Sequence, residues 1–111
     1  MPTIAIIDFE TTGMSPDLGD RPTEVAIVLT ERGAVVDRFQ SLMNPGMVVS
    51  SFITQLTGIT NAMVKAAPPV AQVMAEAARF VGESPMVAHN ASFDRKFWQA
   101  ELRRLNQPAN H

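Results

Sequence analysis

Two acidic residues separated by one position, Asp8 and Glu10, are the first feature of this sequence that could support chemistry. They end an isoleucine-rich segment with the composition of a β-strand. On a strand, residues two apart point to the same face, with Cα atoms roughly 6.5 to 7 Å apart. Such carboxylates can hold two hard cations about 3.5 to 4 Å apart, which activate a water and stabilise a leaving oxygen. Taken alone, the spacing more often means two solvated acids where a strand meets a turn.

The strand face that these acids occupy favours a functional role for them. Ile4 and Ile6 precede them on the same side of the strand, so the face begins apolar and ends in two carboxylates. A carboxylate without compensation is costly on an apolar face. We therefore expect a counter-ion, a metal or open solvent beside Asp8 and Glu10.

A third acid, Asp94, lies in a segment with helical periodicity. At 100° per residue, Asp94 falls inside the arc defined by Phe93, Phe97 and Trp98. An acid on the inward face of a helix needs a partner, which makes Asp94 a candidate ligand. Glu101 falls near the same angle, and an aspartate is also favoured in the first turn of a helix by the helix dipole.

The residues next to the acids offer weaker signals. Thr11, Thr12 and Gly13 could present backbone N–H groups and hydroxyls to a nucleotide, although Thr-Thr-Gly is also an ordinary strand exit. His89 is more often a structural histidine than a catalyst, and Asn90 has the position of a helix N-cap. Residues 55–60 predict a turn that leads to a helix cap.

An α/β sheet is expected to position these residues. The pattern predicts strands over residues 3–10, 23–31 and 34–43, with a tight turn at Arg32-Gly33 that makes the last two an antiparallel hairpin. A short helix capped by Thr60, a helix from Val70 to near Gly82, a strand over 86–89 and a helix over 92–105 follow. Three strands followed by helix, strand and helix indicate a mixed sheet, with Asp8 and Glu10 at the carboxyl end of its first strand.

Length and composition set limits on the protein class. With 111 residues the chain is expected to form one domain, and without cysteine it has no disulfide or thiolate chemistry. It shows no signal peptide and no apolar run of about 20 residues, so we expect a cytoplasmic protein without a membrane segment. The net charge of −2 argues against the basic surface of most nucleic-acid binders, unless bound metal reverses the local field. The basic residues Arg95, Lys96, Arg103 and Arg104 gather in one segment, which most simply forms a solvated helix face.

Two motifs together resemble a known family. The run DFETTG at 8–13 is similar to the first motif of the DEDD-type (DnaQ-like) 3′-to-5′ exonucleases, and AHNASFD at 88–94 is similar to the second. Between them, LTGIT at 56–60 resembles the segment before the first helix in relatives of the proofreading epsilon subunit of bacterial DNA polymerase III. Order and spacing fit along the whole chain.

The resemblance implies a ribonuclease H-like fold and a two-metal phosphodiester hydrolase that removes nucleoside 5′-monophosphates from 3′ ends. It implies Mg²⁺ or Mn²⁺, two ions, with Asp8, Glu10 and Asp94 as metal ligands and catalytic residues. The substrate-binding residues would be Phe9, Thr11, Thr12, Gly58 and Asn90. The implied partners are nucleic acid with a free 3′ end, preferably single-stranded, and DNA polymerase subunits.

The sequence departs from the family at the third motif, a His or Tyr followed by a fourth aspartate. The chain has no tyrosine, and neither of its two histidines can fill this role, because one belongs to the second motif and the other is the last residue. We therefore expect residues 1–111 to be an exonuclease domain that is incomplete at its C-terminus and weak or inactive alone. Two alternatives are a non-catalytic module that binds nucleic acid or a polymerase, and a scaffold that binds a partner through an uncovered sheet.

Overall fold

The computed structural model describes residues 3–88 and 90–106, which form a four-stranded mixed sheet with helices. The strands are β1 (Ile4–Thr11), β2 (Pro22–Glu31), β3 (Ala34–Leu42) and β4 (Met86–Ala88), in the spatial order β3-β2-β1-β4. The helices are the 3₁₀ turn η1 (Pro16–Leu18), α1 (Ser51–Thr57), α2 (Asn61–Lys65), α3 (Val70–Val81) and α4 (Ala91–Arg104). β1 and β3 run antiparallel to β2, and β4 runs parallel to β1. This is the fold class that the sequence predicts.

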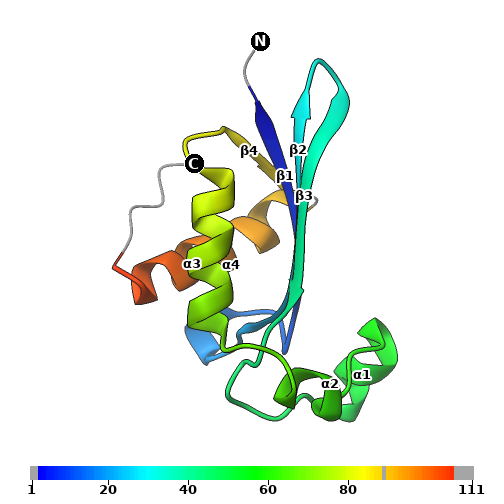
Figure 1. Cartoon of the computed structure of the whole chain (residues 1–111). Helices are drawn as coiled ribbons and strands as arrows, with labels where there is room; N and C mark the ends of the chain where they lie inside the picture. The colour runs from blue at the N-terminus through cyan, green and yellow to red at the C-terminus, as the bar shows by residue number, and fades with distance from the viewer. Residues whose placement is uncertain (1–2, 89, 107–111) are drawn as a thin grey trace.

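The core lies on one face of the sheet. Along β1 the buried residues Ala5, Ile7 and Phe9 alternate with outward-facing ones. Figure 1 shows α3 and α4 on the same side of the sheet, where they cover this buried face. The stripe that α3 turns toward the sheet consists of Val70, Val73, Met74, Ala77 and Val81. Among the described residues no helix covers β1 on the other face, where Ile4 and Ile6 keep 36% and 39% of their surface exposed. On this face Asp8 is exposed and Glu10 is half-buried.

The turn between β2 and β3 has the geometry that the sequence predicts. Arg32 and Gly33 have φ angles of 54° and 80°, and Glu31 pairs directly with Ala34. A two-residue turn with positive φ at both positions matches the right-handed twist of the strands that it joins. The two turn residues are therefore enough to predict this hairpin.

A β-bulge interrupts the pairing of β1 with β2 beside the acidic pair. Glu10 pairs with Glu24, whereas Thr11 pairs with Pro22, so Thr23 is the extra residue on β2. Pro22 and Thr23 are both buried as a result, which breaks the alternation of the strand. The hydroxyl of Thr23 is the one buried side-chain N or O atom in the described part of the chain without a hydrogen-bond partner.

The structure corrects two expectations for the connecting segments. Residues 51–57 form helix α1, where the sequence predicted no helix before Thr60, so LTGIT ends the first helix instead of preceding it. The signals were present but short: the Ser50 hydroxyl accepts a hydrogen bond from the Ile53 N–H, and Gly58 ends the helix with φ 79°. The loop after β1 contains η1, which was also not predicted.

Other boundaries agree with the expectation. Thr60 caps α2 as predicted, and α3 and α4 begin and end close to the expected residues. The end of the predicted strand at His89 lies outside the described residues. Over the described part of the chain, none of the helices has the length and apolar character that crossing a membrane requires.

The unpartnered hydroxyl of Thr23 leads to a stability prediction. Thr23→Val replaces it with a methyl group of similar size, and a buried polar group without a partner costs about 1 to 3 kcal/mol. We expect the free energy of unfolding to rise by about 1 kcal/mol, measured by urea denaturation.

Thr11→Val is the matched control for this variant. Thr11 is also buried, but its hydroxyl donates to the Gly13 carbonyl oxygen at 2.6 Å. The control should therefore lower the free energy of unfolding by about 1 kcal/mol. A Thr23→Val variant destabilised as much as Thr11→Val would show that the Thr23 hydroxyl does have a partner.

Candidate metal and nucleic-acid site

Asp8 and Glu10 lie on the open face of β1, at its carboxyl end. Asp8 is exposed and Glu10 is half-buried. Across the β1–β2 ladder Glu10 stands directly opposite Glu24, and Asp8 stands opposite Ala26. Like charges on facing positions of a sheet repel each other. This end of the open face is therefore locally acidic.

Asp94 belongs to the same region but approaches from the helical layer. It is completely buried in the first turn of α4. One carboxylate oxygen accepts a hydrogen bond from the Phe9 N–H at 3.1 Å, and the other accepts one from the Asn90 N–H at 2.8 Å. The sequence placed Asp94 on the inward arc of its helix and required a partner for it, and both predictions are confirmed.

The Phe9 N–H follows the described pairing of β1 with β4. Ala5 donates to the Pro85 carbonyl oxygen at 2.9 Å, and the last described pair of β1 with β4 is Ile7 and Ala88. Phe9 is the next residue of β1 with the same orientation. Its N–H donates to the Asp94 carboxylate, so Asp94 is joined to the backbone between Asp8 and Glu10.

The loop that leaves β1 folds back on itself around Asp20. One oxygen of Asp20 accepts a hydrogen bond from the Thr12 hydroxyl at 3.0 Å, and the other accepts one from the Ser15 N–H at 3.2 Å. A Cβ on Gly13 would lie 2.6 Å from the Cγ of Asp20, so this close approach requires glycine. Sequence reasoning missed Asp20, because nothing local shows which group its carboxylate meets.

The predicted substrate-binding residues lie in different surroundings. The Phe9 ring is buried and packs near Phe97, with ring centroids 6.5 Å apart, so Phe9 can meet a substrate only through its backbone. Thr11 is buried, Thr12 is half-buried, and Asn90 is exposed at the start of α4. Figure 1 shows α1 and α2 beyond the end of the sheet where β1 ends. Gly58, between these helices, is exposed.

A second contact joins this loop to α4. Glu101 is buried, and its carboxylate forms an ion pair with Arg21 at 2.7 Å. The helical angle in the sequence showed that Glu101 would face inward like Asp94. It could not show the partner, because Arg21 is 80 residues away along the chain.

The donor set suits hard cations in its chemistry. Carboxylate oxygens are the ligands that Mg²⁺ and Mn²⁺ prefer. Asp8 and Glu10 present theirs on one exposed face, and Asp94 is attached to the backbone between them. Within residues 3–88 and 90–106 the structure has no group of three or more His, Asp or Glu residues close enough to hold a metal ion together. Asp8 and Glu10 have the donor chemistry of such ligands, and the roles of Asp8, Glu10 and Asp94 as metal ligands all remain predictions.

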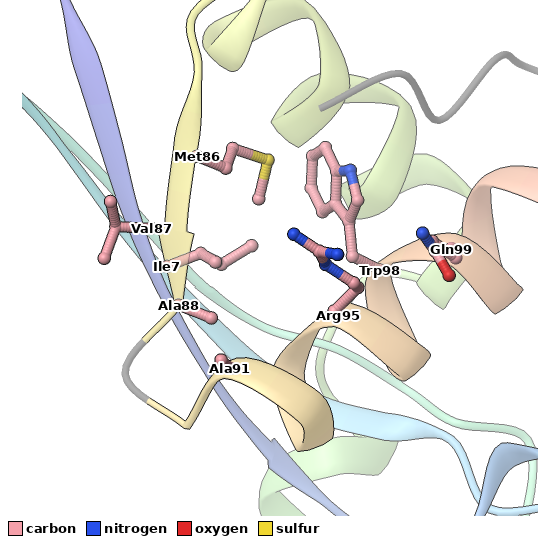
Figure 2. A pocket seen from close by; sticks show the side chains of 8 residues that line it. All are labelled: Ile7, Met86, Val87, Ala88, Ala91, Arg95, Trp98 and Gln99. Atoms are coloured by element: carbon pink, nitrogen blue, oxygen red, sulfur yellow. The ribbon is translucent and has the colours of Figure 1, made fainter.

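A pocket of about 260 Å³ lies elsewhere, between β4 and α4. Figure 2 shows the Arg95 and Trp98 side chains reaching toward it from α4, opposite Met86 and Ile7. None of the three candidate carboxylates lines this pocket. β4 is an edge strand, and this mostly apolar surface is the kind that the scaffold interpretation anticipated.

Comparisons with known proteins agree with this arrangement. A family model for exonucleases, RNase_T, matches residues 5–111. The chain is 39% identical over 100 residues to a PolC-type DNA polymerase III of Caldanaerobacter subterraneus and 41% identical over 97 residues to the 3′-5′ exonuclease DinG of Bacillus subtilis. These matches span 90% and 87% of this chain, but only 7% and 10% of the length of the two relatives.

The fold is also that of solved exonucleases. A product-bound exonuclease I superposes with a TM-score of 0.83 and 22% identity, over 96% of this chain and 26% of that one. A zinc-bound complex of Escherichia coli exonuclease I with single-stranded DNA gives the same TM-score and identity. These likenesses show a ribonuclease H-like exonuclease fold. The family match over residues 5–111 establishes that this chain belongs to the RNase_T exonuclease family.

Proposed function

We propose that residues 1–111 form part of a metal-dependent exonuclease domain that removes nucleoside 5′-monophosphates from the 3′ ends of nucleic acids. The observation that carries this proposal is the position of Asp94, whose carboxylate binds the backbone between Asp8 and Glu10. The matches to a PolC-type polymerase and to a protein named as a 3′-5′ exonuclease support the direction of cleavage.

Asp8 and Glu10 would hold two Mg²⁺ or Mn²⁺ ions on the open face, with Asp94 orienting this part of β1 or completing the ligand set. When bound there, the ions would supply an activated water and stabilise charge on the leaving oxygen. The water would add to phosphorus while the bond to the 3′ oxygen of the preceding nucleotide breaks. The fourth carboxylate and the general base that the family resemblance implies have no assigned residue in this chain.

The groups around the acids would hold the 3′-terminal nucleotide. The contacting groups would be the backbone of Thr11 and Thr12 at the end of β1, the Gly58 turn, and Asn90 at the start of α4. We expect a single strand as the substrate, because solved complexes of structurally similar exonuclease I contain single-stranded DNA. The PolC-type relative suggests that polymerase subunits are partners.

The first test removes one carboxylate from the open face. Asp8 is exposed and has no hydrogen-bond or ion-pair partner in the described part of the chain. Asp8→Asn should therefore leave the free energy of unfolding within about 0.5 kcal/mol of wild type. It should lower the affinity for Mn²⁺ at least about tenfold, measured by titration calorimetry, because it removes a charged ligand.

Asp37→Asn is the matched control, since Asp37 is another exposed strand aspartate, located on β3. It should change neither stability nor Mn²⁺ affinity. Equal Mn²⁺ affinity in wild type and Asp8→Asn would show that Asp8 is not a ligand, and a non-catalytic binding module would then be the better interpretation.

The second test concerns the two roles of Asp94. Both of its oxygens accept hydrogen bonds from backbone N–H groups. Asp94→Asn would turn an amide donor toward one of them, so a buried N–H would lose its acceptor at a cost of about 1 to 3 kcal/mol. Urea denaturation should show this loss in Asp94→Asn and not in Asp8→Asn. If both variants are equally stable, the Phe9 bond does not hold α4 against β1.

A further inference from the structure

The ion pair between Arg21 and Glu101 has a buried acid. Glu101 is 2% exposed and the Arg21 side chain is 24% exposed. Arg21 donates to both carboxylate oxygens, through Nη2 at 2.7 Å and Nε at 3.2 Å. Arg104 lies 3.7 Å from the same carboxylate, but its side chain is half-exposed. A buried acid needs a well-placed partner, and the two-pronged contact of Arg21 supplies it.

Arg21 is also attached to the loop that leaves β1. Its carbonyl oxygen accepts a hydrogen bond from the Thr12 N–H at 2.9 Å, and its own N–H donates to the Thr12 hydroxyl at 3.1 Å. The Thr12 hydroxyl donates in turn to Asp20. Any movement of Arg21 would therefore move the strand exit that follows Asp8 and Glu10.

Glu101 and Asp94 share one face of α4. They are seven residues apart, which is about 10.5 Å along the axis and nearly two full turns. Asp94 holds the backbone of β1 at Phe9, and Glu101 holds Arg21 at the far end of the same loop. The segment from Phe9 to Arg21 is thus fastened to α4 at both ends.

We propose that Arg21 and Glu101 are positioning residues of the candidate site. Their ion pair fixes the rotation of α4 against β1, which keeps Asp94 on the Phe9 N–H and the Thr11–Thr12 backbone beside the open-face carboxylates. Both residues would act through Asp94 and the strand exit, not as ligands of metal or substrate. The proposal rests on the proposed function in one respect, that the carboxylates bind divalent metal.

The test uses the double variant Arg21→Met with Glu101→Met in the 111-residue chain. A single Arg21 variant would leave the Glu101 charge buried, so any loss of metal affinity would be mixed with unfolding. Replacing both members of a buried ion pair with apolar residues of similar size usually preserves the fold. Two readouts are measured on the folded variant: Mn²⁺ affinity by titration calorimetry, and hydrogen exchange of the Phe9 amide by NMR, with the β3 amides as internal reference.

Two further variants test how Mn²⁺ affinity and Phe9 exchange depend on the cations near Glu101. Arg21→Lys keeps the charge but loses the two-pronged contact, so it should fall between wild type and the double variant. Arg104 is the other cation near Glu101; its side chain is half-exposed and lies 3.7 Å from the carboxylate. Arg104→Met should match wild type in both measurements.

We expect the double variant to bind Mn²⁺ about tenfold more weakly, as is usual when a group that orients a metal ligand is removed. Its Phe9 amide should exchange faster than in wild type, while the β3 amides keep their rates. If either the affinity or the Phe9 exchange stays within twofold of wild type in the folded double variant, the positioning role is overturned. Absence of Mn²⁺ binding by the wild-type chain would contradict the proposed function instead, and Phe9 exchange alone would then decide whether the ion pair holds α4.

Discussion

The contact of the Asp94 carboxylate with the Phe9 and Asn90 N–H groups is the constraint on which the rest of this site depends. A carboxylate cannot be buried completely without strong hydrogen-bond donors, and two backbone amides meet this requirement. The donors come from the end of β1 and the start of α4. Satisfying one acid therefore sets the position of the helix on the sheet.

This contact ties the helical layer to the edge of the sheet where β4 lies. The last described pair of β1 with β4 is Ile7 and Ala88, and two residues further along β1 the Phe9 N–H donates to Asp94 on α4. A mostly apolar pocket of about 260 Å³ lies between the same two elements, β4 and α4. Asp94 does not line this pocket, so the polar contact and the apolar pocket are separate features of this edge.

β1 serves the core and the candidate site at once. Its alternation sends Ala5, Ile7 and Phe9 under the helices and leaves Asp8 on the open face. The acids can therefore remain in contact with water without a cost to the core. The bulge at Thr23 and the close packing of Asp20 against Gly13 then turn the chain sharply after Glu10. The strand exit is shaped by these contacts and is held to α4 by Arg21.

Much of this arrangement follows from local patterns that the sequence states directly. The alternation of β1, the Arg32-Gly33 turn, the cap at Thr60 and the apolar stripe of α3 depend on neighbouring residues, so period and turn chemistry predict them. The inward position of Asp94 follows from helical angle alone. The sequence did not predict α1, because this helix has only seven residues and its exposed Phe52 and Leu56 carry no amphipathic pattern.

Only the tertiary structure decided which distant segments contact each other. Helical angle placed Asp94 and Glu101 on one inward face but could not distinguish them, because the difference lies in their partners. Asp94 meets the Phe9 amide near the end of a strand 85 residues earlier, and Glu101 meets the Arg21 side chain. The sequence by itself determined which residues face inward. Which inward acid is joined to the candidate site and which holds the loop depends on how the layers pack, since long-range contacts have no periodic signal along the chain.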